Sequence, residues 1–363
     1  MEYGHGGDIY THEGMTDYSI NVNPFGPGTA VIEAVCGAAA QIGQYPDSRC
    51  TKLRNALAEH LKIPAELLLF GNGAAELMFS LVLAQKPQKA ILAVPSFAEY
   101  EQALKAAGCE IQYYYLQAEE GFCLNENYLD MLTKDVDIIF LCCPNNPTGQ
   151  VIDKELLRKI LDRCEEKQIR MVLDECFCEF LEHPEDTVML PEAVTYRQLF
   201  LLRAFTKIYA MPGLRLGYAV SGDERLREQI ERVRQPWNVS VLAQSAGIAA
   251  LKDQERVAAA REYVAAERKW LEQELDRIGI RHFPSKANYI LLKSNLDLYA
   301  LLKEQKFLIR DCSNYKGLEK GYYRIAVRLR EDNVRLLQAI AGIKEEIPDG
   351  KVNYDSGNHV KCW

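Results

Sequence analysis

The sequence lacks the features that mark a secreted, membrane or nucleic-acid-binding protein. Residues 1–8 carry neither the basic start nor the apolar stretch of a secretory signal, and no later run approaches the roughly 18 apolar residues that span a bilayer. The 43 basic residues are fewer than the 51 acidic ones, and the resulting net charge of -8 predicts no basic face that could bind the backbone of a nucleic acid. We therefore expect a cytoplasmic protein with neither a membrane nor a nucleic acid as partner.

Cysteine spacings typical of a zinc site are absent as well. The 11 cysteines are an odd number, and they include the neighbours Cys142 and Cys143 and the alternate pair Cys176 and Cys178, but no CxxC motif. This pattern favours small buried apolar side chains in a reducing compartment. We expect no metal site, and we find no internal repeat or low-complexity segment.

The apolar residues that are present predict one large and one smaller domain. Helical spacing covers residues 29–44 and 51–61, and from about residue 67 short apolar runs alternate with amphipathic segments. That alternation is typical of an α/β domain with a mostly parallel sheet covered on both faces. The expected strands are 89–94, 110–116, 137–142, 170–173, 199–203 and 214–220, with helices at 97–107 and 154–167.

The last third of the chain has a different texture. A long helical pattern at 253–278 precedes short apolar runs at 289–292, 307–309 and 322–327, which favours a smaller α+β domain. We expect the large domain to span residues 29–252 and the small domain to combine residues 1–28 with 253–347. Residues 348–363 are polar and without periodicity, so we expect a surface tail there.

The strongest local signal is the segment 203–218, in which Lys207 follows an apolar run and Arg215 opens the next one after a Pro-Gly turn. This order can present an amine and phosphate-binding groups to one pocket. The ordinary alternative for any lysine is a solvated surface position. The choice between the two depends on what the rest of the sequence places nearby.

Three other segments favour the pocket. Residues 71–76 pass through two glycines into a helix whose first N–H groups are free to bind a phosphate, although many such segments are only turns. Residues 143–149 follow an expected strand, where open α/β sheets bind ligands, although an Asn-Pro turn fits them equally well. Asp174 ends another expected strand, where its carboxylate can keep a pyridine nitrogen protonated or can simply cap a loop.

In this order the segments resemble the class I and II aminotransferases, pyridoxal-phosphate enzymes of fold type I, over nearly the whole chain. The resemblance implies pyridoxal 5'-phosphate as cofactor, bound as a Schiff base to Lys207, which also transfers protons. It implies Asp174 at the ring nitrogen, Asn146 at the phenolic oxygen and Phe97 on the ring face. The residues implied for the cofactor phosphate are Ala74, Ala75, Thr206 and Arg215.

One position departs from that family and supports a narrower resemblance. Aminotransferases usually carry a tyrosine three residues after the aspartate, whereas this chain has Phe177. Phenylalanine follows the Asp-Glu pair in the threonine-phosphate decarboxylase branch, which is close to the histidinol-phosphate aminotransferases. Residues 5–8, the pair Asn21 and Asn23, and residues 310–315 and 322–328 resemble the same branch.

The narrower resemblance implies a substrate site. Arg324 would bind the substrate carboxylate in the bidentate way a guanidinium favours, and His5 and Arg310 would bind the substrate phosphate. Asn23 would belong to the same site, and Tyr45 would enter it from the second subunit of a homodimer. The alternatives are exposed strand arginines in surface ion pairs and a histidine in a disordered, glycine-rich terminus.

Three functions remain open at this point. The first is decarboxylation of L-threonine O-3-phosphate to (R)-1-amino-2-propanol O-2-phosphate for cobalamin biosynthesis, with serine phosphate as a further substrate. The second is amino-group transfer to a 2-oxo acid, as in histidinol-phosphate aminotransferases. The third is a non-catalytic cofactor-binding module, which an added DNA-binding segment would favour, and the sequence shows none.

Overall fold

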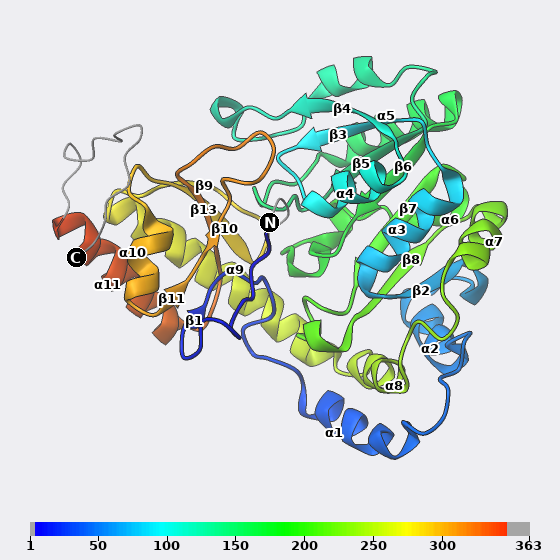
Figure 1. Cartoon of the computed structure of the whole chain (residues 1–363), viewed down its shortest axis with the longest axis horizontal. Coiled ribbons are helices and arrows are strands. Elements are labelled where there is room, and N and C mark those ends of the chain that lie inside the picture. Colours follow the sequence, from blue (N-terminus) through cyan, green and yellow to red (C-terminus); the bar gives the residue numbers. More distant parts are fainter. Residues whose placement is uncertain (1–3, 347–363) are drawn as a thin grey trace.

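The large sheet forms the centre of the molecule in the computed structural model, which describes residues 4–346 (Figure 1). Its seven strands lie in the order β2-β8-β7-β6-β5-β3-β4, and β8 alone runs antiparallel to its neighbours. This arrangement confirms the expected α/β class with a mostly parallel sheet. The strands are β2 (Leu68–Asn72), β3 (Lys89–Val94), β4 (Glu110–Tyr115), β5 (Ile138–Cys142), β6 (Arg170–Asp174), β7 (Leu199–Ala204) and β8 (Leu216–Val220).

Helices cover both faces of this sheet, which explains why its inner strands are mostly apolar. Within β6, Met171 and Leu173 join one apolar cluster while Val172 joins the cluster on the opposite face. The first cluster includes side chains of α1 (Thr29–Ala38), α2 (Thr51–Leu61), α5 (Lys154–Lys167), α6 (Leu190–Thr195) and α8 (Val241–Ala250). The second includes side chains of α3 (Gly73–Gln85), α4 (Ala98–Ala106) and α7 (Glu224–Val233).

A small antiparallel sheet with the order β12-β13-β10-β9 lies beside the large one (Figure 1). A separate parallel pair joins β1 near the N-terminus to β11. The strands are β1 (Thr16–Asp17), β9 (Arg281–Phe283), β10 (Tyr289–Lys293), β11 (Phe307–Leu308), β12 (Arg310–Asp311) and β13 (Tyr322–Ala326). The helices are α9 (Gln254–Arg277), α10 (Leu298–Glu304) and α11 (Arg330–Glu346).

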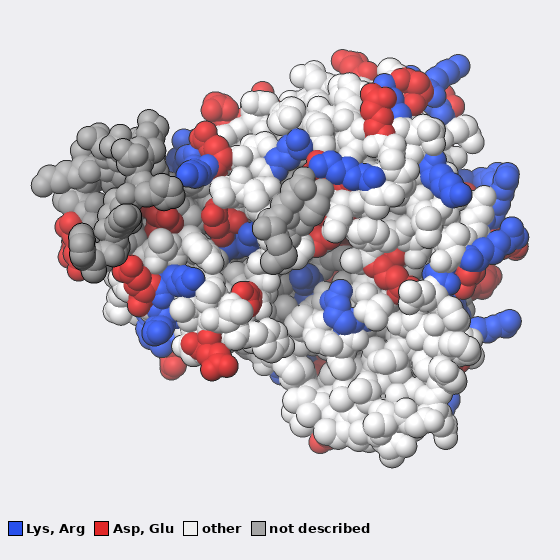
Figure 2. All heavy atoms as spheres, viewed as in Figure 1, with Lys and Arg blue, Asp and Glu red and all other residues white. Residues whose placement is uncertain are grey.

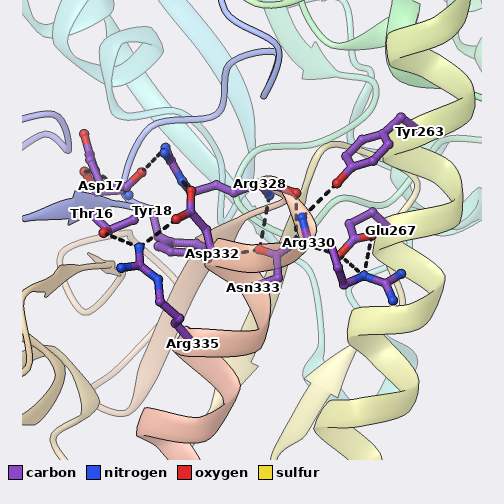
Figure 3. Close-up of polar contacts among 11 residues, drawn as sticks. Thr16, Asp17, Tyr18, Tyr263, Glu267, Arg328, Arg330, Asp332, Asn333 and Arg335 are labelled. Atoms are coloured by element: carbon purple, nitrogen blue, oxygen red, sulfur yellow. Dashed lines mark hydrogen bonds and ion pairs between the residues drawn. The ribbon is translucent and has the colours of Figure 1, made fainter.

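A polar network ties the N-terminal segment to this small region (Figure 3). The Arg328 guanidinium donates to the Asp17 carbonyl at 2.9 Å, and the Tyr18 hydroxyl donates to the Asn333 side chain at 3.1 Å. Asn333 in turn donates to Glu267 of α9 at 3.0 Å. These bonds, two of which are buried, fix the chain just before residues 19–21, which line a cavity beside the large sheet.

Several expected elements differ from the observed ones at their ends. The expected helix 29–44 stops at Ala38 and continues only as a 3-10 turn, since the residues that follow are mostly exposed and Gly43 interrupts the segment. The expected strand 307–309 ends at Leu308, and Arg310–Asp311 form a separate strand that was not expected, because β11 pairs with β1 whereas β12 joins the small sheet. The 3-10 turns are Ala39–Gln41, Ala65–Leu67, Ala118–Glu120, Glu126–Met131, Cys178–Phe180, Pro184–Asp186 and Pro212–Leu214.

The domain boundaries at residues 28 and 252 stay predictions. The tail expected at 348–363 lies outside the described residues. Within residues 4–346, no helix combines the length and the apolar character that crossing a bilayer requires.

Candidate active site

A cavity of about 340 Å³ lies at the carboxyl ends of β5, β6 and β7, where the small sheet and the N-terminal segment close over them. All of the sequence-predicted site residues except Asn23 and Tyr45 line it. Those that do are His5, Ala74, Ala75, Phe97, Asn146, Asp174, Thr206, Lys207, Arg215, Arg310 and Arg324. The structure therefore brings together residues that lie up to 319 positions apart, from His5 to Arg324.

Lys207 stands in the loop that leaves β7. Its carbonyl accepts hydrogen bonds from the backbone of Asn23 at 2.9 Å and of Ala210 at 3.2 Å, which hold the loop, and its Nζ lies 5.2 Å from the centroid of the Phe177 ring. Burial lowers the pKa of Lys207 and the nearby Arg324 lowers it further, against the opposing effect of Cys176. A lowered pKa leaves more of the amine neutral, and the neutral amine is the nucleophile.

Asp174, at the end of β6, is held by two donors. Its Oδ2 accepts from the Tyr100 hydroxyl at 2.7 Å, and its Oδ1 accepts from the backbone N–H of Cys176 at 2.9 Å. The Tyr100 ring also meets the Phe97 ring edge to face, with centroids 5.7 Å apart. The carboxylate is therefore fixed in direction, although it is buried.

An anion cradle forms where β2 turns into α3. Gly73 has φ +77°, and a Cβ on it would overlap the Arg215 guanidinium, while a Cβ on Gly217 of β8 would overlap the backbone of Gly73 and Ala74. The two glycines thus let the start of α3 approach both β8 and Arg215. The first N–H groups of a helix have no intrahelical acceptor, and here they face the same cavity as Thr206 and Arg215.

Arg324, from β13, is buried among oxygen acceptors. One guanidinium nitrogen, Nη2, donates to the Ser19 carbonyl at 2.8 Å, and the other, Nη1, bonds to Oδ1 of Asn146. With its amide oxygen turned towards Arg324, Asn21 accepts from Nε at 3.2 Å and from Nη1 at 3.1 Å. Arg324 is thereby directed into the cavity by neighbours from two separate parts of the chain, residues 19–21 and Asn146.

The outer end of the cavity holds Arg310, His5 and Glu99. Arg310, from β12, donates to the Gly4 carbonyl at 2.6 Å and to Asn314 Oδ1 at 2.9 Å. Burial lowers the pKa of His5, and the neighbouring Arg310 lowers it further. Oε1 of Glu99 lies 3.5 Å from Nδ1 of His5, and burial raises the pKa of Glu99 to about 7.

Two predicted site residues lie elsewhere. Asn23 does not line the cavity, because its Nδ2 donates to the Ile208 carbonyl at 2.8 Å and supports the Lys207 loop from outside. Its neighbour Asn21 occupies the cavity wall instead. Tyr45 is 76% exposed and stacks on Trp237 at 4.3 Å, so within its own chain it is not part of the site.

Sequence reasoning also missed Glu99 and Tyr100, which lie two and three residues after Phe97. As the first turn of an amphipathic helix, they carried no signal beyond helical periodicity. The one available clue was their position after the expected strand at residues 89–94, since the segments that follow parallel strands gather at one edge of the sheet.

The arrangement suits pyridoxal 5'-phosphate. The cradle at α3, Thr206 and Arg215 matches a phosphate group, Asp174 offers a fixed carboxylate to a ring nitrogen, and Lys207 offers an amine with a lowered pKa. Among the described residues no group of three or more His, Cys, Asp or Glu side chains has the geometry of a metal site. Fold and site together define an α/β enzyme of fold type I that depends on pyridoxal phosphate.

The family model described as aminotransferase class I and II matches residues 13–340. The chain therefore belongs to the class I and II aminotransferase family, whose members are pyridoxal-phosphate enzymes.

Individual relatives cover nearly the whole chain. A threonine-phosphate decarboxylase from Salmonella typhimurium is 38% identical over 351 residues, which are 93% of this chain and 96% of that protein. A histidinol-phosphate aminotransferase from Bacillus cereus is 31% identical over 334 residues, 90% of this chain and 88% of that protein. The crystal structure of a histidinol-phosphate aminotransferase from Clostridium acetobutylicum, 32% identical, superposes with a TM-score of 0.86 over 92% of this chain and 100% of that one.

Proposed function

We propose that this enzyme decarboxylates a small phosphorylated amino acid, L-threonine O-3-phosphate, to (R)-1-amino-2-propanol O-2-phosphate. The observation that carries the proposal is the set of three guanidinium groups in one cavity, those of Arg215, Arg310 and Arg324. They match the three anionic groups that such a reaction brings together: the cofactor phosphate, the substrate phosphate and the substrate carboxylate. The 38% identity to the Salmonella typhimurium decarboxylase supports the same reaction.

The sheet side of the cavity would hold the cofactor. When bound, pyridoxal phosphate supplies an electron sink for a bond that breaks at the α-carbon of an amino acid. Lys207 Nζ would bind it and move protons, and Asp174, held by Tyr100, would keep a proton on the ring nitrogen. Phe97 would stack on the ring, and Asn146 would contact the phenolic oxygen. The phosphate would lie against Ala74, Ala75, Thr206 and Arg215.

The outer side would orient the substrate. Arg310 and His5 would bind its phosphate and Arg324 its carboxylate, so that both ends of a short molecule are held at once. The orientation of the α-carbon then decides whether its bond to the carboxylate or its bond to hydrogen breaks. Binding a remote phosphate to direct the reacting carbon uses binding energy where it accelerates the reaction.

Phe177 supports decarboxylation over amino transfer. Its ring faces the Lys207 amine and meets the Tyr289 ring edge to face at 5.1 Å, and it offers no hydroxyl where the family usually has a tyrosine. The cofactor would therefore lose one hydrogen bond that aminotransferases of this family use.

Histidinol-phosphate amino transfer is the second candidate. The identities of 31% and 32% to two such enzymes favour it, as does the shared need to bind a phosphorylated amine. Serine phosphate is a further candidate substrate of the decarboxylation, since one methyl group changes selectivity by only about 1–3 kcal/mol.

We further propose a cytoplasmic homodimer that serves cobalamin biosynthesis, in which Tyr45 of each subunit reaches the other's site. The surface over α1 carries almost no charged side chains (Figure 2). Exposed apolar residues of this region are Ile32, Ile42, Tyr45 and Trp237. Light scattering of the purified protein tests the dimer, and a monomer with full activity would contradict the shared site.

One assay tests the reaction. The purified holoenzyme is incubated with threonine phosphate, with and without a 2-oxo acid acceptor. We expect carbon dioxide release at the same rate in both, because decarboxylation needs no acceptor. Strict dependence of turnover on the acceptor would contradict decarboxylation and favour the aminotransferase.

A further inference from the structure

Glu99 has no part in the mechanism above, although it lines the same cavity. It is the second residue of α4, its side chain is only 15% exposed, and within residues 4–346 its Oε2 is buried without a hydrogen-bond partner. A buried carboxylate oxygen without a donor costs free energy, and the neutral acid carries a smaller cost than the ion. The surroundings of Oε2 therefore favour a protonated Glu99.

Charged groups from four other parts of the chain face Glu99. His5 comes from the N-terminal segment, Arg310 from β12, Lys207 from the loop after β7 and Asp174 from the end of β6. Burial, with a smaller effect of Asp174, raises the pKa of Glu99 to about 7, although the backbone N–H of Glu99 itself, Lys207 and Arg310 act in the opposite direction. Burial and Arg310 lower the pKa of His5. When the two side chains hold a single proton between them, that proton is therefore on Glu99 and not on His5.

The position of Glu99 creates a conflict with the proposed substrate. Arg310 and His5 are the proposed ligands of a phosphate dianion, and the Glu99 carboxyl lies 3.5 Å from His5. An ionised Glu99 would repel that dianion, whereas a protonated Glu99 would not. A bound dianion also raises the proton affinity of every group around it.

We propose that Glu99 and His5 form a proton-holding pair that takes up a proton when a phosphate dianion binds, which makes Glu99 a specificity-determining residue for phosphorylated substrates. The inference rests on the proposed function, because it takes Arg310 and His5 as the phosphate ligands. On binding, an ionised Glu99 takes up a proton from solvent, which reaches it beside the 54% exposed side chain of His5, and it becomes a neutral acid that no longer repels the dianion. The proton returns to solvent when the product leaves.

Sulfate binding to the holoenzyme tests the pair without turnover. Sulfate remains a dianion throughout the range in which the pair titrates, so any change of its affinity with pH comes from the protein. We expect the affinity to fall by up to about tenfold per pH unit above about pH 7, with matching proton uptake in calorimetry in buffers of different ionisation enthalpy.

Glu99→Gln keeps the shape of the side chain but cannot titrate. We expect it to lose at least half of the proton uptake and most of the pH dependence of sulfate binding. Glu101→Gln is the matched control, since Glu101 lies in the same first turn of α4 but pairs with Lys105 and Tyr113 outside the cavity. A merely structural role of Glu99 at the helix start would leave the pH dependence unchanged in both variants.

Each outcome decides the proposal. A wild-type pH dependence in Glu99→Gln overturns it, and so does a holoenzyme that binds no sulfate, because the phosphate ligands are then wrong as well. Glu99→Asp provides a second variant, for which the pH dependence should persist but move to lower pH. If wild-type protein releases carbon dioxide while Glu99→Gln binds sulfate like wild type, only the pair is wrong. If the pH dependence disappears as expected but no carbon dioxide is released, only the reaction is wrong.

Discussion

The two sides of the cavity are built in different ways. On the sheet side, Asp174 ends β6, and Asn146 and Lys207 lie in the loops that directly follow the neighbouring strands β5 and β7. On the outer side, His5, Arg310 and Arg324 come from the N-terminal segment and the small sheet, and His5 is more than half exposed. The sheet side suits chemistry that a whole family shares, and the outer side suits the choice of one substrate.

The two sides also differ in how many hydrogen-bond donors their buried carboxyl groups have. Asp174 is held by two close donors, whereas Glu99 has one oxygen 3.5 Å from His5 and the other without a partner. A poorly paired carboxylate such as that of Glu99 can change its protonation when a ligand binds. Mutations on the two sides should therefore have different consequences.

Lys207→Ala should have the largest effect. Loss of the amine removes both covalent binding and proton transfer, so we expect kcat to fall by at least about 10²–10⁴-fold. The absorbance change that borohydride causes in the holoenzyme should disappear as well. Lys52→Ala, at an exposed position of α2, is the control and should keep both properties. Persistence of the absorbance change in Lys207→Ala would remove Lys207 from its role.

Arg310→Ala should weaken substrate binding on the outer side of the cavity and leave the sheet side unchanged. Removing a charged hydrogen-bond donor costs about 1.5–3 kcal/mol, so KM for threonine phosphate should rise by about 10- to 100-fold. Steady-state kinetics with threonine as an unphosphorylated analogue provide the comparison. If KM rose equally for both compounds, Arg310 would not be a phosphate ligand.

Tyr100→Phe should weaken the sheet side moderately. The variant leaves Asp174 without its 2.7 Å donor, and we expect a loss of about 1–3 kcal/mol in the free energy of unfolding together with weaker cofactor binding. Tyr113→Phe removes a similar bond to Glu101 at a partly exposed site and should cost less. Urea unfolding of both variants measures the difference. Equal losses in the free energy of unfolding would show that the hydrogen bond to Asp174 stabilises the protein no more than the bond to Glu101 does.

Glu99→Gln should have the smallest effect, and its sign depends on pH. The pKa of Glu99 is about 7 in the folded protein against an ordinary value of 4.5, so ionisation opposes folding as the pH rises through this range. After allowance for partial exposure, the variant should be about 1–2 kcal/mol more stable than wild type near pH 8 and equal to it near pH 4. Thermal unfolding at both pH values checks this, and a pH-independent difference would contradict it.

The sheet side could be predicted from the sequence because a parallel sheet places every strand's carboxyl end at one edge. The apolar runs that end next to Asp174 and Lys207 were therefore enough to assign both residues to one pocket. The family resemblance supplied their roles, and these stay proposals. Arg310 and Arg324 were chosen by resemblance alone, and the structure places both in the cavity.

Other features depend on packing that no local pattern encodes. Asn21 and Asn23 are two residues apart, and only the path of the chain past the Lys207 loop decides which of them faces the cavity. Glu99 follows helical periodicity like any residue of a first turn, and its meeting with His5 joins segments 94 positions apart. The role of Tyr45 depends on a second subunit, which one sequence does not describe.

Product analysis in deuterated water tests the central claim most directly, because decarboxylation replaces the carboxylate with one solvent hydrogen. The holoenzyme is incubated with threonine phosphate without acceptor, and the amine product is analysed by mass spectrometry. The account predicts one carbon-bound deuterium per molecule of carbon dioxide released. A 2-oxo product that forms only when an acceptor is added would contradict it.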